Sequence, residues 1–231
     1  MRPRILDLFC CAGGAGMGYH QAGFDVVGVD KVRRARYPFT FIQADVLDLT
    51  PEFVASFDAI HASPPCQAHT SMKTMPDARE HVDLIPQTRA MLRASGRPYV
   101  IENVVGARGH LVCPMLLCGS MFGLGAKGAQ LQRHRLFETS FLLMSPGRCA
   151  HASPTIGIYG EGCRDSRRKY DKSIPEFTVD DGREAMEMPW ASIAELCEAI
   201  PPAYTRFIGR QLAAHLADAA ASDAAVRERA A

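Results

Sequence analysis

The chain has 231 residues, enough to bury a sizeable core as one domain or as a domain with a small attachment. Its 47% hydrophobic and 22% charged residues are typical of an ordinary soluble globular protein, and a net charge of +1 does not indicate a strongly basic surface. No apolar run approaches the roughly 20 residues that a membrane span needs, so we expect no membrane partner.

The eight cysteines do not have the pattern of a disulfide framework. They are spread along a chain that is long enough to fold without covalent cross-links. The sequence runs from Met1 into an apolar segment without a signal peptide. We therefore expect a reducing, cytoplasmic location.

The first 30 residues have the pattern of a nucleotide-binding strand–turn–helix–strand unit. The apolar run 5–9 predicts a strand, and the glycine-rich segment 10–18 predicts a turn. Residues 19–24 could be helical, and the run 26–29 predicts a second strand that ends in Asp30. Glycines let the backbone approach a ligand, and an acid at the end of the next strand can hold ribose hydroxyls. The flanking strands favour ligand binding over a plain structural turn.

Two further predicted strands end in polar or reactive residues. Residues 40–43 predict a third strand, with Asp45 shortly after it. Residues 57–62 predict a fourth, and Cys66 follows on a turn that two prolines stiffen. Because open α/β sheets bind ligands at the carboxyl ends of their strands, Cys66 is a candidate nucleophile. A buried structural cysteine is the alternative that this stretch alone leaves open.

A predicted helix and a fifth strand come next. Residues 82–95 carry apolar side chains at helical spacing, and residues 99–101 predict a strand that ends in Glu102 and Asn103. Candidate functional groups therefore follow four strands, more than chance loop chemistry would supply.

A pair of arginines follows a loop-rich stretch. If residues 132–138 form a strand, Arg133 and Arg135 point to the same face, because side chains alternate along a strand. His134 lies between them, and like His69 it could assist proton transfer or simply be a loop or surface residue.

The last part of the chain is less regular. Residues 141–183 are polar and glycine-rich, and their basic cluster could contact phosphates or be a solvated face. The chain closes with a helix whose apolar stripe comprises Tyr204, Phe207, Ile208, Leu212 and Leu216.

Cysteines and a histidine near this region could be combined into a zinc site. Cys149 and His151, with Cys163 and either Cys113 or Cys118, would supply enough ligands. Their spacing fits no common zinc pattern, so we predict no metal site.

Five segments together resemble the motifs of the cytosine 5-methyltransferases, which methylate carbon 5 of cytosine in DNA from S-adenosylmethionine. In the family's order they are Asp7-Leu8-Phe9 with Gly13 and Gly14, Ser63 to Gln67, Glu102-Asn103-Val104, Arg133-His134-Arg135, and Ile200-Pro201-Pro202. The resemblance covers most of the chain. It implies a Rossmann-like α/β methyltransferase fold with a central, mostly parallel sheet and a small irregular recognition insertion.

This resemblance implies a division of the chain. We expect a catalytic and cofactor-binding core over residues 1–140 and a reduced target-recognition region over 141–183. C-terminal motifs and a helix that packs back on the core would follow over 184–217, with a frayed tail over 218–231. The recognition interval is short for the family, so sequence selectivity could be slight or a partner could hold the DNA.

The resemblance also implies a covalent mechanism. The Cys66 thiolate would add to carbon 6 of cytosine, and Glu102 would protonate or hydrogen-bond ring nitrogen 3. Arg135, together with Arg133, would hold the cytosine carbonyl. A free thiol titrates near ~8.5, so nearby positive charge or concerted ring protonation must assist the addition. A cytosine within a duplex must first be flipped out of the helix.

S-adenosylmethionine is the implied cofactor. Phe9 would stack on its adenine, Asp30 would bind the ribose and Asp45 the adenine amino group. The full set implied for the cofactor is Asp7, Phe9, Gly13, Gly14, Asp30, Asp45 and Pro64. The set implied for the substrate is Pro65, Gln67, Thr70 and Asn103, with Thr70 where the family often has a serine that touches DNA phosphate.

The chain departs from the family pattern at several positions. Cys11 stands where a glycine is usual in the cofactor turn, and Leu131 replaces a glutamine two residues before Arg133. Cys197 and Glu198 replace a glycine–asparagine pair. None of these changes removes a catalytic group, but they bear on the geometry of the cofactor turn and the packing of the recognition region.

Three functions remain open at this point. The first is a DNA cytosine 5-methyltransferase acting as a monomer on a base flipped from double-stranded DNA. The second is the same reaction on RNA, such as transfer RNA. The third is a non-catalytic DNA- or cofactor-binding relative, against which the intact Cys66, Glu102 and Arg135 argue.

Overall fold

A seven-stranded sheet forms the centre of the computed structural model, which describes residues 2–69, 81–151, 154–160 and 162–230. The strand order is β3-β2-β1-β4-β5-β9-β6. β1 to β5 run parallel, and β9 lies antiparallel between β5 and β6. The strands are β1 (Arg4–Leu8), β2 (Asp25–Asp30), β3 (Thr40–Gln43), β4 (Ala59–Ala62), β5 (Tyr99–Asn103), β6 (Met115–Leu117) and β9 (Arg135–Thr139). The predicted mostly parallel α/β architecture is confirmed.

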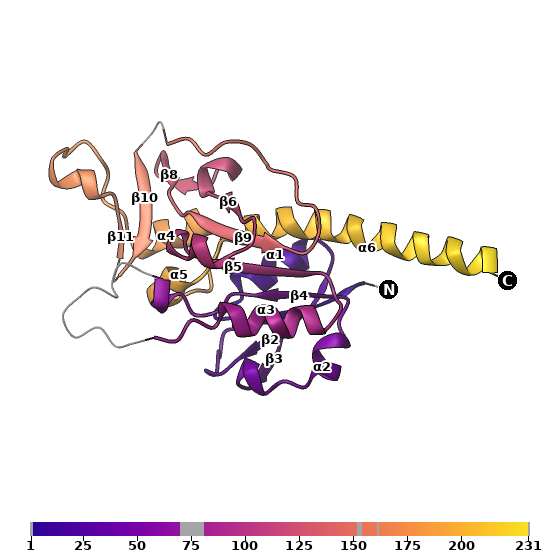
Figure 1. Cartoon of the computed structure of the whole chain (residues 1–231). Coiled ribbons are helices and arrows are strands. Elements are labelled where there is room, and N and C mark those ends of the chain that lie inside the picture. Colours follow the sequence, from indigo (N-terminus) through magenta and orange to yellow (C-terminus); the bar gives the residue numbers. More distant parts are fainter. Residues whose placement is uncertain (1, 70–80, 152–153, 161, 231) are drawn as a thin grey trace.

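Helices cover both faces of this sheet (Figure 1). α1 (Gly14–Gln21) and α6 (Pro202–Ala230) lie on one face, and α2 (Pro51–Ala55) and α3 (Ile85–Ala94) lie on the other. Successive side chains of a strand point to opposite faces, so Ile5 packs in the cluster beneath α1 and α6 while Leu6 packs in the cluster beneath α3. The central strands are mostly apolar because both of their faces are buried.

A second, smaller sheet has the order β11-β10-β8-β7. Its strands are β7 (Gly125–Ala126), β8 (Ala129–Leu131), β10 (Thr155–Tyr159) and β11 (Gly162–Arg164), and α4 (Val179–Met186) and α5 (Ile193–Glu198) pack against it. Short 3-10 turns complete the described chain: Val46–Asp48, Gln67–His69, Val105–His110, Gly119–Phe122 and Ser166–Lys169.

This sheet alters two expectations about the recognition region. Residues 141–183 are not irregular throughout, because they supply β10 and β11. The predicted boundary at residue 140 also divides the sheet, since β10 pairs with β8, which precedes that boundary. Strands of two or three residues are too short to show a period-two pattern in the sequence.

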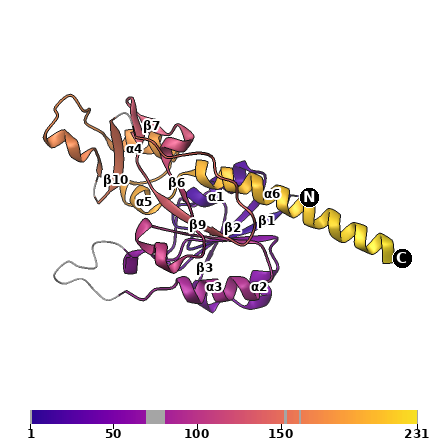
Figure 2. The same ribbon diagram turned by 45° about the horizontal axis from the view of Figure 1, so that its top comes forward.

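The C-terminal helix differs from the prediction as well. α6 continues to Ala230 instead of ending near Ala217, and past Leu216 none of its described side chains is buried. Alanine, arginine and glutamate favour helix without any packing, which explains the extension. The helix projects beyond the body of the protein in both views (Figures 1 and 2). Among the described residues, none of the helices combines the length and the apolar character of a membrane span.

Candidate active site

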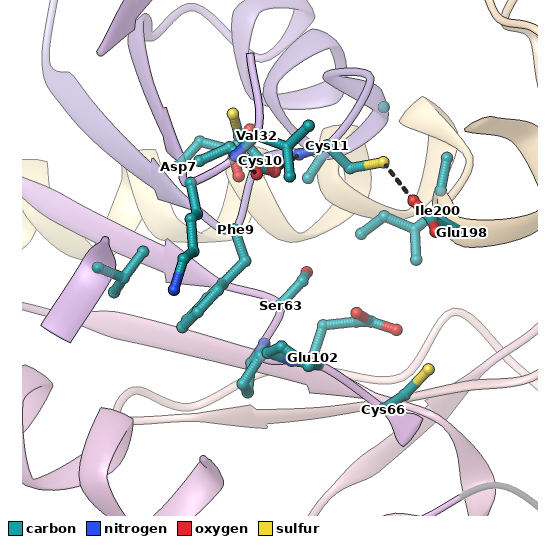
Figure 3. A pocket seen from close by; sticks show the side chains of 18 of the residues that line it. Asp7, Phe9, Cys10, Cys11, Val32, Ser63, Cys66, Glu102, Glu198 and Ile200 are labelled. Atoms are coloured by element: carbon teal, nitrogen blue, oxygen red, sulfur yellow. Dashed lines mark hydrogen bonds between the residues drawn. The ribbon is translucent and has the colours of Figure 1, made fainter. Parts of the chain in front are cut away.

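A cavity of about 480 Å³ opens at the carboxyl ends of the parallel strands (Figure 3). Doubly wound sheets bind ligands at this edge, and the volume lies within the roughly 300–1,000 Å³ range of small-molecule sites. Of the predicted site residues, the cavity is lined by Asp7, Phe9, Gly14, Asp30, Asp45, Pro64, Pro65, Cys66, Gln67, Glu102 and Arg135. Gly13, Asn103 and Arg133 lie behind this lining, and Thr70 lies outside the described residues.

The turn after β1 presents an aromatic ring to the cavity. Phe9 and Cys11 have φ values of 56° and 44°, left-handed conformations that cost non-glycine residues on the order of 1–3 kcal/mol each. Hydrogen bonds hold the turn in place: Cys10 N donates to Val29 O at 3.1 Å, and Cys11 N donates to Asp30 Oδ2 at 3.0 Å. The bend turns the Phe9 side chain out of the strand and into the cavity (Figure 3).

Two glycines allow close packing behind this turn. Gly13 has a φ of 79° and precedes α1. A Cβ added to Gly14 would lie 2.2 Å from the carbonyl oxygen of Ile200. Glycine at position 14 therefore lets the segment before α6 close directly over the turn, which brings Ile200 into the cavity lining.

One acid ends β2 and another follows β3 at the cavity. Asp30 accepts hydrogen bonds from the backbone nitrogens of Cys11 and Val32, at 3.0 and 2.8 Å. Asp45 accepts from Leu47 N at 3.1 Å and pairs with Lys31 at 3.1 Å. These two interactions, the backbone hydrogen bond first, lower the pKa of Asp45 and keep its carboxylate ionised. The cavity thus has acceptor groups at two strand ends.

Asp7 is a buried acid with one unpartnered oxygen. Tyr37 Oη donates to its Oδ2 at 3.1 Å, while Oδ1 is buried and has no hydrogen-bond partner among the described residues. Burial raises the pKa of Asp7 to about 8, against the lowering effect of Tyr37. A buried, unsatisfied acceptor favours a ligand that donates a hydrogen bond to it, and a cationic donor would also lower the raised pKa of Asp7. No motif in the sequence singled out Tyr37.

Cys66 lies in the loop after β4, and its position is fixed from behind. Asn103 is buried, and its Nδ2 donates to the carbonyl oxygen of Pro64 at 2.9 Å. Asn103 is thus a positioning residue for the loop. Burial and the nearby Glu102 raise the pKa of the Cys66 thiol, and Arg135 acts in the opposite direction. The thiol is protonated at neutral pH in the ligand-free protein.

Glu102 and Arg135 form an ion pair beside Cys66. Arg135 Nε lies 3.2 Å from Glu102 Oε1, and both side chains line the cavity. Burial raises the pKa of Glu102, although Arg135 opposes it. A carboxyl with a raised pKa can donate a proton or a hydrogen bond to a ring nitrogen, and the guanidinium can hold a carbonyl oxygen.

Arg133 does not join Arg135, contrary to the prediction from strand alternation. β9 begins at Arg135, so the alternation does not extend back to Arg133. Its buried guanidinium donates to the backbone carbonyls of Cys197, Ala199 and Ile158. Burial lowers the pKa of Arg133 to about 9. Arg133 therefore ties the small sheet to the segment before α6 and stays behind the cavity wall.

A buried hydrogen-bond chain leads away from Glu102. Ser63 hydrogen-bonds to Glu102, its Oγ lies 3.0 Å from His61 Nε2, and His61 Nδ1 lies 3.0 Å from Tyr19 Oη. Burial lowers the pKa of His61 to about 3, so the ring is neutral. Sequence patterns did not indicate this chain, because its members come from α1, from β4 and the residue after it, and from β5, and meet only in the fold.

Comparison with known proteins finds a related family. Residues 3–111 match the sequence model for the C-5 cytosine-specific DNA methylases. Over these residues, slightly less than half of its length, the chain is similar to that family. A 123-residue match at 28% identity connects it to the Type II methyltransferase M.XorII of Xanthomonas oryzae pv. oryzae. That match covers 46% of this chain and 29% of the relative, so the chain spans less than a third of that protein's length.

Solved structures with the same fold cover nearly the whole chain. The S. pombe Dnmt2 methyltransferase aligns with a TM-score of 0.61 at 13% identity, over 94% of this chain and 99% of that one. A DNMT2 mutant of Spodoptera frugiperda aligns with a TM-score of 0.60 at 14% identity, over 91% and 99%. Identities this low show the fold alone, and they confirm the predicted methyltransferase architecture.

Similarity to this family implies S-adenosylmethionine as the cofactor. The residues present fit it. S-adenosylmethionine carries an ammonium and a sulfonium charge, a ribose and an adenine ring. The cavity offers a buried unpartnered carboxyl oxygen on Asp7, the ring of Phe9, and acidic acceptors at Asp30 and Asp45.

Two departures from the family pattern contact each other. Cys11, in place of a glycine, donates through Sγ to Glu198 Oε2 at 3.3 Å. Glu198 stands in place of an asparagine and also faces Arg34 Nη2 at 3.8 Å. All three residues line the cavity, so the two substitutions form one local contact at its edge (Figure 3).

Proposed function

We propose that this protein transfers a methyl group from S-adenosylmethionine to carbon 5 of a cytosine in DNA, through a covalent Cys66 adduct at carbon 6. The observation that carries the proposal is that Cys66, Glu102 and Arg135 line the same cavity as the predicted cofactor residues. This shared lining supports the proposal that a thiol, a ring acid and a carbonyl clamp act on one cytosine beside one methyl donor.

The cofactor supplies an electrophilic methyl group on a sulfonium sulfur. Phe9 would lie against its adenine, Asp30 would accept from its ribose hydroxyls, and Asp45 would accept from the adenine amino group. Asp7 would face its cationic portion, which would satisfy the buried Oδ1.

Cys66 begins the reaction by forming a bond between its sulfur and carbon 6 of the cytosine. The thiol is protonated in the free protein, so its proton must leave as the bond forms. Glu102 assists by giving a hydrogen bond or proton to ring nitrogen 3, and Arg135 stabilises negative charge on the carbonyl oxygen. Carbon 5 becomes nucleophilic and takes the methyl group. The proton on carbon 5 then passes to water, which breaks the sulfur–carbon bond and restores the thiolate.

Two findings favour DNA as the substrate. The family that matches residues 3–111 is described as DNA methylases, and the curated relative is a Type II methyltransferase. The base would be flipped from duplex DNA, at a cost of a few kcal/mol. The small sheet and the basic segment around Ser166–Lys169 would hold the opened strand, although Asp165 and Glu176 already pair with Arg167 and Arg168. The same site chemistry would serve a cytosine in RNA.

The test offers labelled S-adenosylmethionine separately with duplex DNA, single-stranded DNA and transfer RNA. After digestion to nucleosides, we expect label in 5-methyldeoxycytidine from duplex DNA. Label only in RNA would replace DNA with RNA as the substrate, and label in none would reject the enzyme.

A matched pair of variants tests the nucleophile in the same assay. Cys66→Ser should abolish transfer while cofactor binding survives, because the hydroxyl is a far weaker nucleophile than the thiolate. Cys113→Ser, at an exposed cysteine outside the cavity lining, should keep full activity.

A further inference from the structure

Two cysteines and two histidines converge away from the cavity. Cys118 begins the turn Gly119–Phe122 after β6, and His134 lies between β8 and β9. Cys149 and His151 lie in the segment that precedes β10. Their ligand atoms all lie within 4.8 Å of one another, although they come from three distant parts of the sequence.

Hydrogen bonding does not explain this arrangement. His151 Nε2 lies 3.0 Å from Cys149 Sγ, 3.5 Å from Cys118 Sγ and 3.4 Å from His134 Nε2. His134 Nε2 also lies 3.2 Å from Cys149 Sγ. A neutral imidazole nitrogen carries either one proton or one lone pair, so it cannot hydrogen-bond to three such partners at once. A cation among the four atoms would satisfy all of them.

The distances match the edges of a tetrahedron around zinc. With Zn–S near 2.3 Å and Zn–N near 2.05 Å, a tetrahedral site has S···N edges of about 3.5 Å and N···N edges of about 3.4 Å. The separations of 3.5 Å and 3.4 Å equal these edges, and the two S···N separations at Cys149, 3.0 and 3.2 Å, are shorter, so Cys149 would move outward when the ion binds. Two thiolates and two imidazoles in this geometry are a donor set typical of zinc.

We propose that Cys118, His134, Cys149 and His151 bind one Zn²⁺ ion in a closed, structural site. Binding would replace two thiol protons, which pass to solvent, with two Zn–S bonds. The Ser120 hydroxyl, which donates to Cys149 Sγ at 3.5 Å, would support one of the thiolate ligands.

This assignment corrects the ligand set considered from the sequence. Cys163 is buried against Gly182 in the small sheet, and Cys113 is exposed elsewhere; neither belongs to the cluster. His134 replaces them. The sequence gives no sign of its role as a ligand, because only the fold brings it near Cys149.

A second cluster, at His69, Asp83 and His110, provides a contrast. Each carboxylate oxygen of Asp83 faces one ring nitrogen, at 3.0 Å from His69 and 2.8 Å from His110. Ordinary hydrogen bonds to a carboxylate account for these three residues without an ion. A substitution in this second cluster therefore serves as a control for the loss of zinc from the first.

The zinc ion would fix the segment that carries the active-site arginine. His134 is adjacent to Arg135, and its carbonyl oxygen accepts from Arg135 Nη1 at 2.9 Å. Arg135 in turn pairs with Glu102. The ion would also tie the chain before β10 to β8 and β6, and so hold the small sheet against the central one.

The test measures metal content in tag-free full-length protein by inductively coupled plasma mass spectrometry. We expect one zinc per chain in the wild type and a loss of that zinc in Cys118→Ser and Cys149→Ser. Cys163→Ser, Cys113→Ser and His110→Ala should retain it. His134→Cys should retain zinc, since a thiolate replaces the imidazole, whereas His134→Ala should lose it.

The wild-type protein keeps the test decisive even where a variant fails to fold. Replacing the zinc with Co²⁺ should produce the visible bands of a tetrahedral site and a thiolate-to-cobalt charge-transfer band. A wild-type chain that neither contains zinc nor takes it up would overturn the proposal, as would a disulfide between Cys118 and Cys149. Metal content is measured without any methyl transfer, so this result is independent of the proposed reaction.

Discussion

The hydrogen bond between Asn103 and Pro64 allows a specific prediction about how the nucleophile is positioned. Asn103 Nδ2 donates to the Pro64 carbonyl at 2.9 Å, and Asn103 is only 1% exposed. Asn103→Ala leaves that carbonyl without its donor, which costs about 1–3 kcal/mol. For a chain of this size, 2 kcal/mol corresponds to a fall of roughly 4–8 °C in Tm.

The same substitution should lower kcat and leave KM for the nucleic acid nearly unchanged. Pro64 precedes Cys66 by two residues, so without this hydrogen bond the thiol is no longer held in one position relative to the base. The surface that binds the nucleic acid is unchanged. If half of the 2 kcal/mol appears in the transition state, kcat falls about fivefold. Thermal melts and initial rates of methyl transfer measure the two effects.

Two variants control this experiment. Asn103→Asp keeps an acceptor for Val104 N, a bond of 2.9 Å in the wild type, but removes the donor to Pro64. It should therefore be impaired like Asn103→Ala. Gln211→Ala removes a comparable amide contact with Met144 on the exposed part of α6 and should change neither quantity. Wild-type Tm and kcat in Asn103→Ala would refute the positioning role.

Three further predictions concern the cavity and its surroundings. Gly14→Ala should abolish cofactor binding in calorimetry, because the new Cβ would press on the Ile200 carbonyl; unchanged affinity would contradict this packing. Between about pH 4 and pH 8, Asp7 binds more protons in the folded protein than in the unfolded chain. The free energy of unfolding of the cofactor-free protein should therefore fall as pH rises, by up to about 1.4 kcal/mol per pH unit. Asp7→Asn should remove that part of the dependence in melts across this range, and an unchanged profile would argue against the raised pKa. Arg133→Lys should lower Tm by losing buried carbonyl contacts, whereas Arg135→Lys should lower kcat with little change in Tm; the reverse pattern would exchange their roles.

Much of the central fold was predictable because it depends on local patterns. Runs such as 26–29 are apolar and end in an acid, and parallel strands necessarily bring their carboxyl ends to one edge. Asp30, Asp45, Cys66 and Glu102 therefore line one cavity, as their positions after predicted strands implied.

The remaining features depend on contacts between distant segments. Tyr37 reaches Asp7 across 30 residues, and His61 carries no sign in the sequence that its partners are Ser63 and Tyr19. The prediction that Arg133 shares a face with Arg135 was wrong. Pairing with β5 and β6 determines where β9 begins, and the spacing of the two arginines does not reveal that pairing.

A trapped adduct at Cys66 would test the central proposal most directly. The protein is incubated with S-adenosylmethionine and duplex DNA that contains 5-fluorocytosine, whose fluorine cannot leave as a proton does. The final elimination is blocked, so we expect a stable protein–DNA complex and a nucleotide-modified peptide that contains Cys66 in mass spectrometry. Cys66→Ser should give no complex. An adduct at another cysteine, or methylated product without any adduct, would contradict the mechanism.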